Sequence, residues 1–95
     1  MQARTVTIRN VLGMHARAAA RFVHAAGSFQ SRVSVTREDR ADRAVDGKSI
    51  LGILLLAAAR GIAVTITADG LDEADALGAL CGLVESGFGE EPCSD

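Results

Sequence analysis

The sequence contains no tryptophan and no tyrosine, and only two cysteines and one proline among its 95 residues. Nucleic-acid-binding proteins commonly stack bases on aromatic side chains, so this composition argues against a nucleic-acid partner. Cys81 falls within an apolar helical pattern and Cys93 in a polar tail, and neither has a CxxC partner. We therefore expect two reduced thiols, no metal site and no cofactor.

The sequence also lacks a hydrophobic run long enough to cross a membrane. Its most apolar stretch, residues 50–59, is interrupted by Gly52 and stopped by Arg60. That stretch is about half of the roughly 20 residues that a membrane-spanning helix needs. The first ten residues have no apolar segment of the kind found in a signal peptide. We therefore expect a cytoplasmic protein that does not use a membrane as a partner.

The 48% of hydrophobic residues is enough for one small globular domain. We place this domain at residues 1–89 and expect residues 90–95 to form a flexible tail. The charge is unevenly distributed, because residues 1–43 contain eight arginines and three acidic residues, whereas residues 44–95 contain two basic and nine acidic residues. A basic half of this kind suits a small anion or an acidic protein partner.

Two periodicities predict the secondary structure. Alternation of β-branched with other residues predicts strands, and apolar residues at every third or fourth position predict helices. The predicted strands are residues 4–9, 32–36, 44–45 and 62–68. The predicted helices start near His15, at Ile50 and at Asp72, and end near residues 27, 58 and 86. The core-facing residues are predicted to be Ala19, Phe22, Val23 and Ala26 in the first helix, and Ala74, Leu77, Cys81 and Val84 in the last.

This β-α-β-β-α-β-α order predicts an α+β fold. The four strands are expected to form one antiparallel sheet, and the three helices to cover one of its faces. The result is an open-faced β-sandwich.

His15 is the strongest candidate for a chemical role. It occupies the junction between a loop and a helix, where backbone N–H groups lack acceptors and the helix dipole is positive, so an anion is favoured there. Arg17 lies in the same turn and adds a forked donor that suits phosphate oxygens. Imidazole titrates near neutral pH, so a neutral nucleophilic nitrogen is available. The alternative is that His15 is only a polar cap of the helix.

Ser49 and the apolar residues after it form a second candidate region. As the residue before a helix, Ser49 is a typical N-cap, and a phosphate on it would also lie at a positive helix end. The short helix that follows is too apolar to be buried completely. We expect Ile50 and Leu54 to be exposed beside Met14, as a surface for docking a partner.

Taken together, the segments GMHARAA, GKSILG and GLDEADAL resemble the HPr family of phosphocarriers of the bacterial phosphotransferase system. The resemblance covers nearly the whole chain and implies the HPr-like open-faced sandwich. We expect the protein to be a monomer. The resemblance also implies that His15 accepts a phosphoryl group on its pros nitrogen from enzyme I and donates it to an enzyme IIA histidine. Arg17 would contact the phosphate, and Met14, Ile50 and Leu54 would contact partners. Ser49 would be a regulatory site for a serine kinase and phosphorylase.

The chain departs from the family pattern at two places. The family usually has proline where this chain has Ala18, and the turn REDRADRA is longer than usual. The segment VDGKSILGILLLAAARG, residues 45–61, is also similar to the nitrogen-related branch of these carriers. A role in sugar transport and a role in nitrogen regulation therefore both remain as alternatives. Two other classes remain as alternatives: a regulatory interaction module that acts through Ser49 without phosphotransfer, and a ligand-binding sandwich of the ferredoxin-like type.

Overall fold

The structure is a computed structural model of the chain and describes residues 1–40 and 43–89. Within these ranges the strands and helices follow the predicted order. The strands are β1 (Gln2–Thr7), β2 (Arg32–Arg37), β3 (Ala44–Asp46) and β4 (Ala63–Asp69). The α-helices are α1 (Ala16–Gly27), α2 (Ile50–Leu56) and α3 (Glu73–Glu85), and the short 3₁₀ helices are η1 (Glu38–Arg40) and η2 (Gly87–Gly89).

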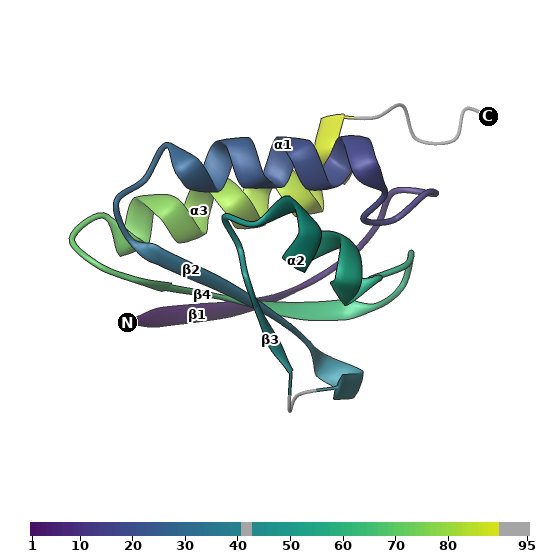
Figure 1. The fold of residues 1–95 in the computed structure, drawn as a ribbon, viewed down its shortest axis with the longest axis horizontal. Helices are drawn as coiled ribbons and strands as arrows, with labels where there is room; N and C mark the ends of the chain where they lie inside the picture. Colours follow the sequence, from purple (N-terminus) through teal and green to yellow (C-terminus); the bar gives the residue numbers. More distant parts are fainter. Residues whose placement is uncertain (41–42, 90–95) are drawn as a thin grey trace.

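The strands form one sheet in the order β1-β4-β2-β3, and every neighbouring pair is antiparallel. The three α-helices lie on one side of this sheet, which leaves the other side open (Figure 1). Alternate residues of the strands point toward the helices and are buried, among them Val33, Val35, Val64, Ile66 and Ala68. The predicted α+β open-faced sandwich is therefore confirmed.

Helix α1 forms from an alanine-rich segment, and alanine has the highest helix propensity. Its buried residues are Ala18, Ala19, Phe22 and Ala26, and Val23 packs against the core while partly exposed. Phe22 is completely buried, and burial of a side chain of this size contributes about 1.5–3 kcal/mol to stability. The predicted core face of this helix is thus confirmed.

Helix α2 ends two residues earlier than predicted. Ala57 adopts a left-handed conformation with φ of 54°, and its N–H donates to the carbonyl of Leu54 at 3.1 Å. The guanidinium of Arg37 then donates to the carbonyls of Leu56 (3.2 Å) and Ala57 (3.1 Å). These bonds occupy carbonyl groups that the helix end leaves without internal partners. Arg37 therefore fixes the turn that leads from α2 to β4.

Two further predictions, on the bounds of the first strand and on the core face of the last helix, are wrong in part. The first strand spans Gln2–Thr7 rather than residues 4–9, because its ladder ends where Thr7 pairs with Ala63 of β4. In α3, Ala74 is exposed, whereas Ala76 and Leu80 are buried. Apolar residues occur on nearly every side of this helix, so their spacing does not define a single core face. The predicted tail, residues 90–95, and Cys93 lie outside the described residues.

Asp72 joins α3 to the loop between α1 and β2. Its carboxylate accepts hydrogen bonds from the backbone N–H groups of Gln30 (2.8 Å) and Ser31 (2.9 Å), and also from the Ser31 hydroxyl. The Ser31 hydroxyl is the main cause, and the Gln30 N–H the next, of a pKa for Asp72 below its ordinary value. Asp72 therefore cross-links two segments far apart in sequence, in addition to standing at the start of α3.

We predict that Asp72→Asn makes the stability of the folded protein depend less on pH under acidic conditions. Because the Asp72 pKa is lower in the folded than in the unfolded state, its contribution is present near neutral pH and is lost as the pH falls below about 4. The variant should have a lower Tm at pH 7 and a smaller loss of Tm between pH 7 and pH 3. Thermal unfolding across this range measures both quantities. Glu85→Gln, at the exposed end of α3, is the control, and equal pH dependence in both variants would contradict the assignment.

Candidate functional site

His15 is the N-cap residue of α1. Its backbone is extended (φ −72°, ψ 179°), its carbonyl accepts from the N–H of Ala19 at 2.8 Å, and its Nδ1 accepts from the backbone N–H of Arg17 at 3.2 Å. The side chain is half-buried. Since Nδ1 is the acceptor, the neutral ring carries its proton on Nε2. The structure thus directs the Nδ1 lone pair toward the first turn of α1.

The surroundings of His15 favour negative charge. The first turn of α1 contains no acidic residue, and its backbone N–H groups stand at the positive end of the helix dipole. Arg17 is exposed within this turn. One turn later, the guanidinium of Arg21 donates to the carbonyl of Phe88. His15 and Arg17 therefore lie together at a helix start that suits an anion.

Not all of the small residues around His15 are accessible. Ala16 is exposed, but Ala18 and Ala19 are completely buried against the core. Of these three residues, only Ala16 leaves its side chain open to solvent beside His15. Ala18 in this chain is a packing residue.

Met14 does not belong to an exposed surface. It is only 5% exposed and forms part of the hydrophobic core, and its backbone N–H donates to the carbonyl of Ala58 at 2.9 Å. Ile50 and Leu54 are exposed, as expected, but a Met14 side chain buried to this extent offers a partner very little surface. A buried thioether here anchors the loop and holds the following residue, His15, at the surface.

Ser49 caps α2 as expected. Its Oγ accepts from the N–H of Gly52 at 3.1 Å, which is the usual geometry of a serine N-cap. Next to it, the ammonium of Lys48 donates to the carbonyl of Phe29 at 2.7 Å. Ser49 is half-buried, and its helix packs directly against α1. The helix starts that carry His15 and Ser49 therefore belong to neighbouring helices.

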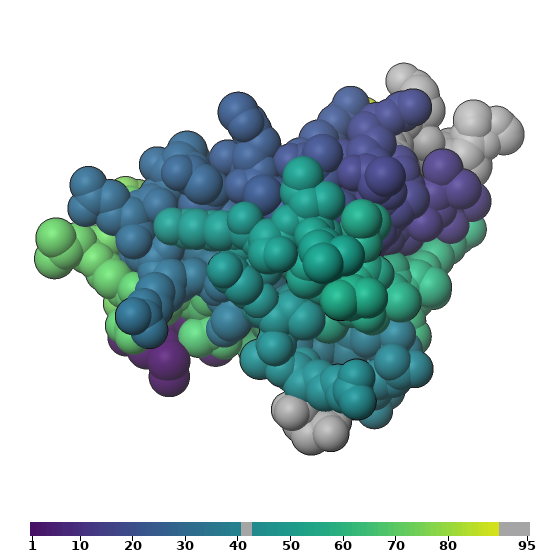
Figure 2. Space-filling model, in the orientation of Figure 1, coloured from purple at the N-terminus to yellow at the C-terminus, as the bar shows by residue number. Residues whose placement is uncertain are grey.

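Helix α2 exposes an apolar surface, and it lies at the centre of the face in Figure 2. Ile50 and Leu54 are 47% and 37% exposed, as predicted, but Leu51 and Leu55 are more exposed, at 66% and 70%. The exposure of Leu51 and Leu55 was not predicted. The buried residues Ile53 and Leu56 indicate where the core lies, and a period of 3.6 residues places Leu51 and Leu55 opposite them. Val11 and Leu12, in the loop before His15, are also exposed and were not predicted.

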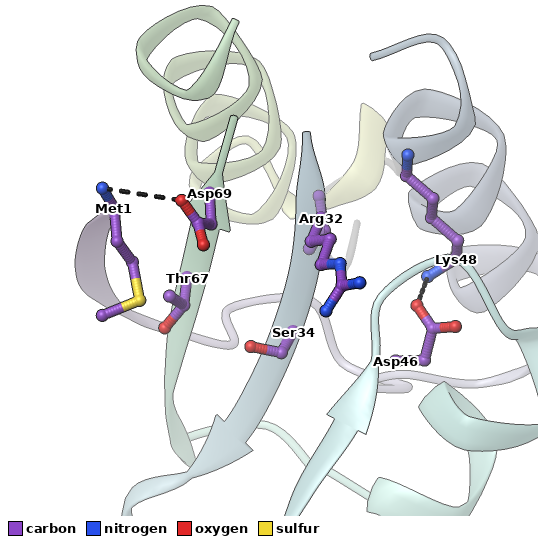
Figure 3. Close-up of a pocket in the computed structure, with 8 residues that line it drawn as sticks. Met1, Arg32, Ser34, Asp46, Lys48, Thr67 and Asp69 are labelled. Carbon is purple, nitrogen blue, oxygen red and sulfur yellow. Dashed lines mark hydrogen bonds and ion pairs between the residues drawn. The ribbon is translucent and has the colours of Figure 1, made fainter. Parts of the chain in front are cut away.

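The open face of the sheet has a hollow of about 520 Å³, shown in Figure 3. Cationic and anionic groups share it: the Met1 amine lies 3.8 Å from the Asp69 carboxylate, and Asp46 accepts from the Lys48 backbone N–H at 2.9 Å. This hollow lies on the side of the sheet opposite the helices, so it is separate from the start of α1. Its mixed charge gives no clear preference for an anion.

Four further observations concern residues 1–40 and 43–89. In these ranges no three His, Cys, Asp or Glu side chains gather in an arrangement that could hold a metal ion. No helix formed by them has the length and apolar character needed to cross a bilayer. Cys81 is completely buried, and this burial is the main cause of its raised pKa. His24 is exposed on α1, as an ordinary surface residue would be.

The fold and the site together define a small α+β protein that presents a half-buried histidine at the start of a helix. Comparison with known proteins identifies its family. The family described as "PTS HPr component phosphorylation site" matches residues 2–86. The chain therefore belongs to the HPr family, and it functions as a histidine phosphocarrier of the phosphotransferase system.

Individual relatives agree with this assignment. The chain is 47% identical to the phosphocarrier protein HPr of Cupriavidus necator over 90 residues, which cover 95% of this chain and 98% of the relative. It is 38% identical over 90 residues, with the same coverage, to the phosphocarrier protein NPr of Proteus mirabilis. A solved structure of HPr-C-His from Thermoanaerobacter tengcongensis superposes with a TM-score of 0.89 at 43% identity, covering 96% of this chain and 99% of that one. A role confined to regulation through Ser49 is not favoured by these relatives.

Proposed function

We propose that His15 is the residue that carries the phosphoryl group, and that it does so on Nδ1, the pros nitrogen. The observation that carries this proposal is the 3.2 Å hydrogen bond from the Arg17 N–H to Nδ1. It turns the Nδ1 lone pair toward the amides at the start of α1. A phosphoryl group attached to this nitrogen would have its oxygens close to those donors.

Transfer of the phosphoryl group to His15 replaces one P–N bond by another and changes the hydrogen bonds around Nδ1. The donor is a phosphorylated histidine of enzyme I, whose P–N bond breaks as a new P–N bond forms to His15 Nδ1. The hydrogen bond from the Arg17 N–H to Nδ1 is then replaced by a charge-assisted bond from an N–H to a phosphoryl oxygen. The guanidinium of Arg17 adds a second donor to these oxygens. The proton on Nε2 stays in place, so loading requires no proton transfer at His15.

The exposed hydrogen bond between His15 Nδ1 and the Arg17 N–H fits the role of a carrier. Among the described residues the phosphoryl group would lie at the surface, so the partners would supply the exclusion of water and most of the stabilisation of the transition state. We propose enzyme I as donor and an enzyme IIA histidine as acceptor, with the exchange taking place in the cytoplasm between monomers of this chain and the partner. The exposed apolar residues of α2, Ile50 and Leu54, would pack against both partners.

Ser49 would regulate this exchange. Its phosphorylation by a serine kinase adds about 1.5 to 2 negative charges at the start of α2, and a phosphorylase would remove them. Because α2 packs against α1, this charge would stand on the same surface that an anionic phosphorylated donor has to approach. Phosphorylation would thus slow the transfer to His15 without unfolding the chain.

The test compares the wild type with Ser49→Asp and Ser49→Ala, each incubated with phosphoenolpyruvate and the cognate enzyme I. Aspartate is a good N-cap, so Ser49→Asp should fold. We predict that the wild type and Ser49→Ala acquire an acid-labile, base-stable phosphate, and that Ser49→Asp loads at least about tenfold more slowly, a difference of about 1.4 kcal/mol. The initial rate of the mass increase measures this. A wild type that never loads would contradict the carrier role, and equal rates for all three would contradict regulation at Ser49.

A further inference from the structure

Asn10 is a buried polar residue in the loop that precedes His15. It is only 7% exposed, although most asparagines lie at protein surfaces. Burying an amide costs stability unless its groups are hydrogen-bonded, so its position needs a physical reason. Asn10 could not be identified from the sequence, because no periodicity or spacing distinguishes it from an ordinary turn residue.

The hydrogen bonds of Asn10 close the loop on itself. Its Nδ2 donates to the carbonyl of Gly13 at 2.7 Å, and its backbone carbonyl accepts from the N–H of Gly13 at 3.1 Å. The first of these bonds is buried, where a hydrogen bond is less exposed to competition from water. Asn10 therefore holds both polar groups of the Gly13 backbone.

The orientation of Gly13 determines that of the next two residues. The Gly13 carbonyl belongs to the peptide unit that joins Gly13 to Met14, and the N–H of the same unit donates to the Ala58 carbonyl at 2.9 Å. That peptide unit is thus held at both ends, by Asn10 on its oxygen and by Ala58 on its nitrogen. A planar peptide fixed at both ends leaves the chain little freedom as it enters His15.

We infer that Asn10 is a positioning residue for phosphotransfer, because it holds the loop in the conformation that places the His15 ring at the start of α1. This inference rests on the proposed role of His15. Asn10 does not touch the phosphoryl group in this account, and it acts only through the Gly13 peptide. Its contribution is to keep His15 in place before the partner arrives, so that docking does not have to order the loop.

The experiment uses Asn10→Ala and the isosteric Asn10→Asp, both of which remove the Nδ2 donor. We expect kcat/KM for loading by enzyme I to fall between about 10-fold and 100-fold, the range that a small misplacement of a reacting group produces. Asp72→Asn is the matched control, because it removes one acceptor oxygen and the charge from the cross-link between α3 and the loop that follows α1 and leaves the start of α1 untouched. It should lose stability and load at the wild-type rate when assayed well below its Tm.

A second measurement separates positioning from stability. In the wild type, the amide resonance of Arg17 should move as the His15 ring is protonated, because protonation removes the Nδ1 acceptor. In the two Asn10 variants this dependence should be weakened, whereas in Asp72→Asn it should be unchanged. Folded Asn10 variants that load at the wild-type rate and keep the Arg17 dependence would overturn the inference.

The wild type supplies a test that does not depend on a variant folding. One Nδ2 proton of Asn10 should exchange slowly with solvent and keep its resonance position when His15 is loaded. Rapid exchange of both protons would contradict the inference. The two proposals fail differently: a wild type that does not load removes the carrier role of His15, while a wild type that loads and Asn10 variants that load equally well remove only the role of Asn10.

Discussion

His15→Ala is expected to abolish loading by enzyme I, to below the detection limit of intact-mass analysis. The change removes the nucleophilic nitrogen. Among the described residues the only other histidine, His24, stands on an exposed part of α1, about two and a half turns beyond His15. Within residues 1–40 and 43–89 no second imidazole lies near the start of α1, and a phosphate labile in acid and stable in base is typical of phosphohistidine. Incubation with phosphoenolpyruvate and enzyme I, followed by mass spectrometry, checks this result.

Two control variants separate the loss of the nucleophilic nitrogen from a loss of stability. His15 also caps α1, and replacing a cap by alanine costs about 0.5–2 kcal/mol, so His15→Ala changes stability as well. Asparagine is a good N-cap, and His15→Asn should therefore keep the helix and still fail to load. His24→Ala should load like the wild type. A His15→Ala or His15→Asn protein that acquired the same acid-labile phosphate would contradict the assignment of His15.

Gly13→Ala is expected to lower the free energy of unfolding and to slow loading as well. Gly13 has φ of +65°, and a Cβ added there would lie 2.7 Å from the carbonyl oxygen of Ala58 and 2.9 Å from the Cα of Ala59. A non-glycine residue in this conformation costs about 1–3 kcal/mol, and the neighbouring atoms belong to backbone that cannot easily move aside. The loop should shift away from the 58–59 turn and displace His15 with it.

Gly78→Ala is the matched control for this prediction. Gly78 lies within α3 with no atoms within 4 Å of an added Cβ, so alanine there should raise stability by about 0.5–1 kcal/mol. Urea denaturation measures both effects, and the loading rate measured at a temperature where both variants are folded gives the functional effect. If Gly13→Ala were as stable as Gly78→Ala and loaded as fast, the loop would not be held against the 58–59 turn in the way described.

Much of the fold could be predicted because local patterns and tertiary packing agree in this chain. The alternation in residues 32–36 and 62–68 reflects a sheet with one buried and one open face, and it identifies β2 and β4 almost to the residue. The positions of His15 and Ser49 at two helix starts also follow from local rules, because capping depends on neighbouring residues only. The family resemblance added the chemistry that these positions imply.

The features that could not be predicted depend on long-range contacts. Met14 is buried because its loop lies against Ala58, 44 residues later in the chain, and no local pattern reports that contact. The same holds for Asn10, whose amide is enclosed only once the loop has folded, and for Asp72, whose carboxylate accepts from Ser31, 41 residues earlier in the chain. Leu51 and Leu55 were missed for a different reason, because a helix that is apolar on every side gives no indication of which residues face the core.

The most direct test of the central claim is to identify the atom that carries the phosphoryl group. The protein labelled with ¹⁵N and loaded by phosphoenolpyruvate and enzyme I should show a single coupling between ³¹P and Nδ1 of His15, together with a shift of the Arg17 amide resonance as its N–H turns from the ring nitrogen to a phosphoryl oxygen. A phosphoryl group found on Nε2, or on the Ser49 oxygen alone, would contradict the account of how the start of α1 receives it.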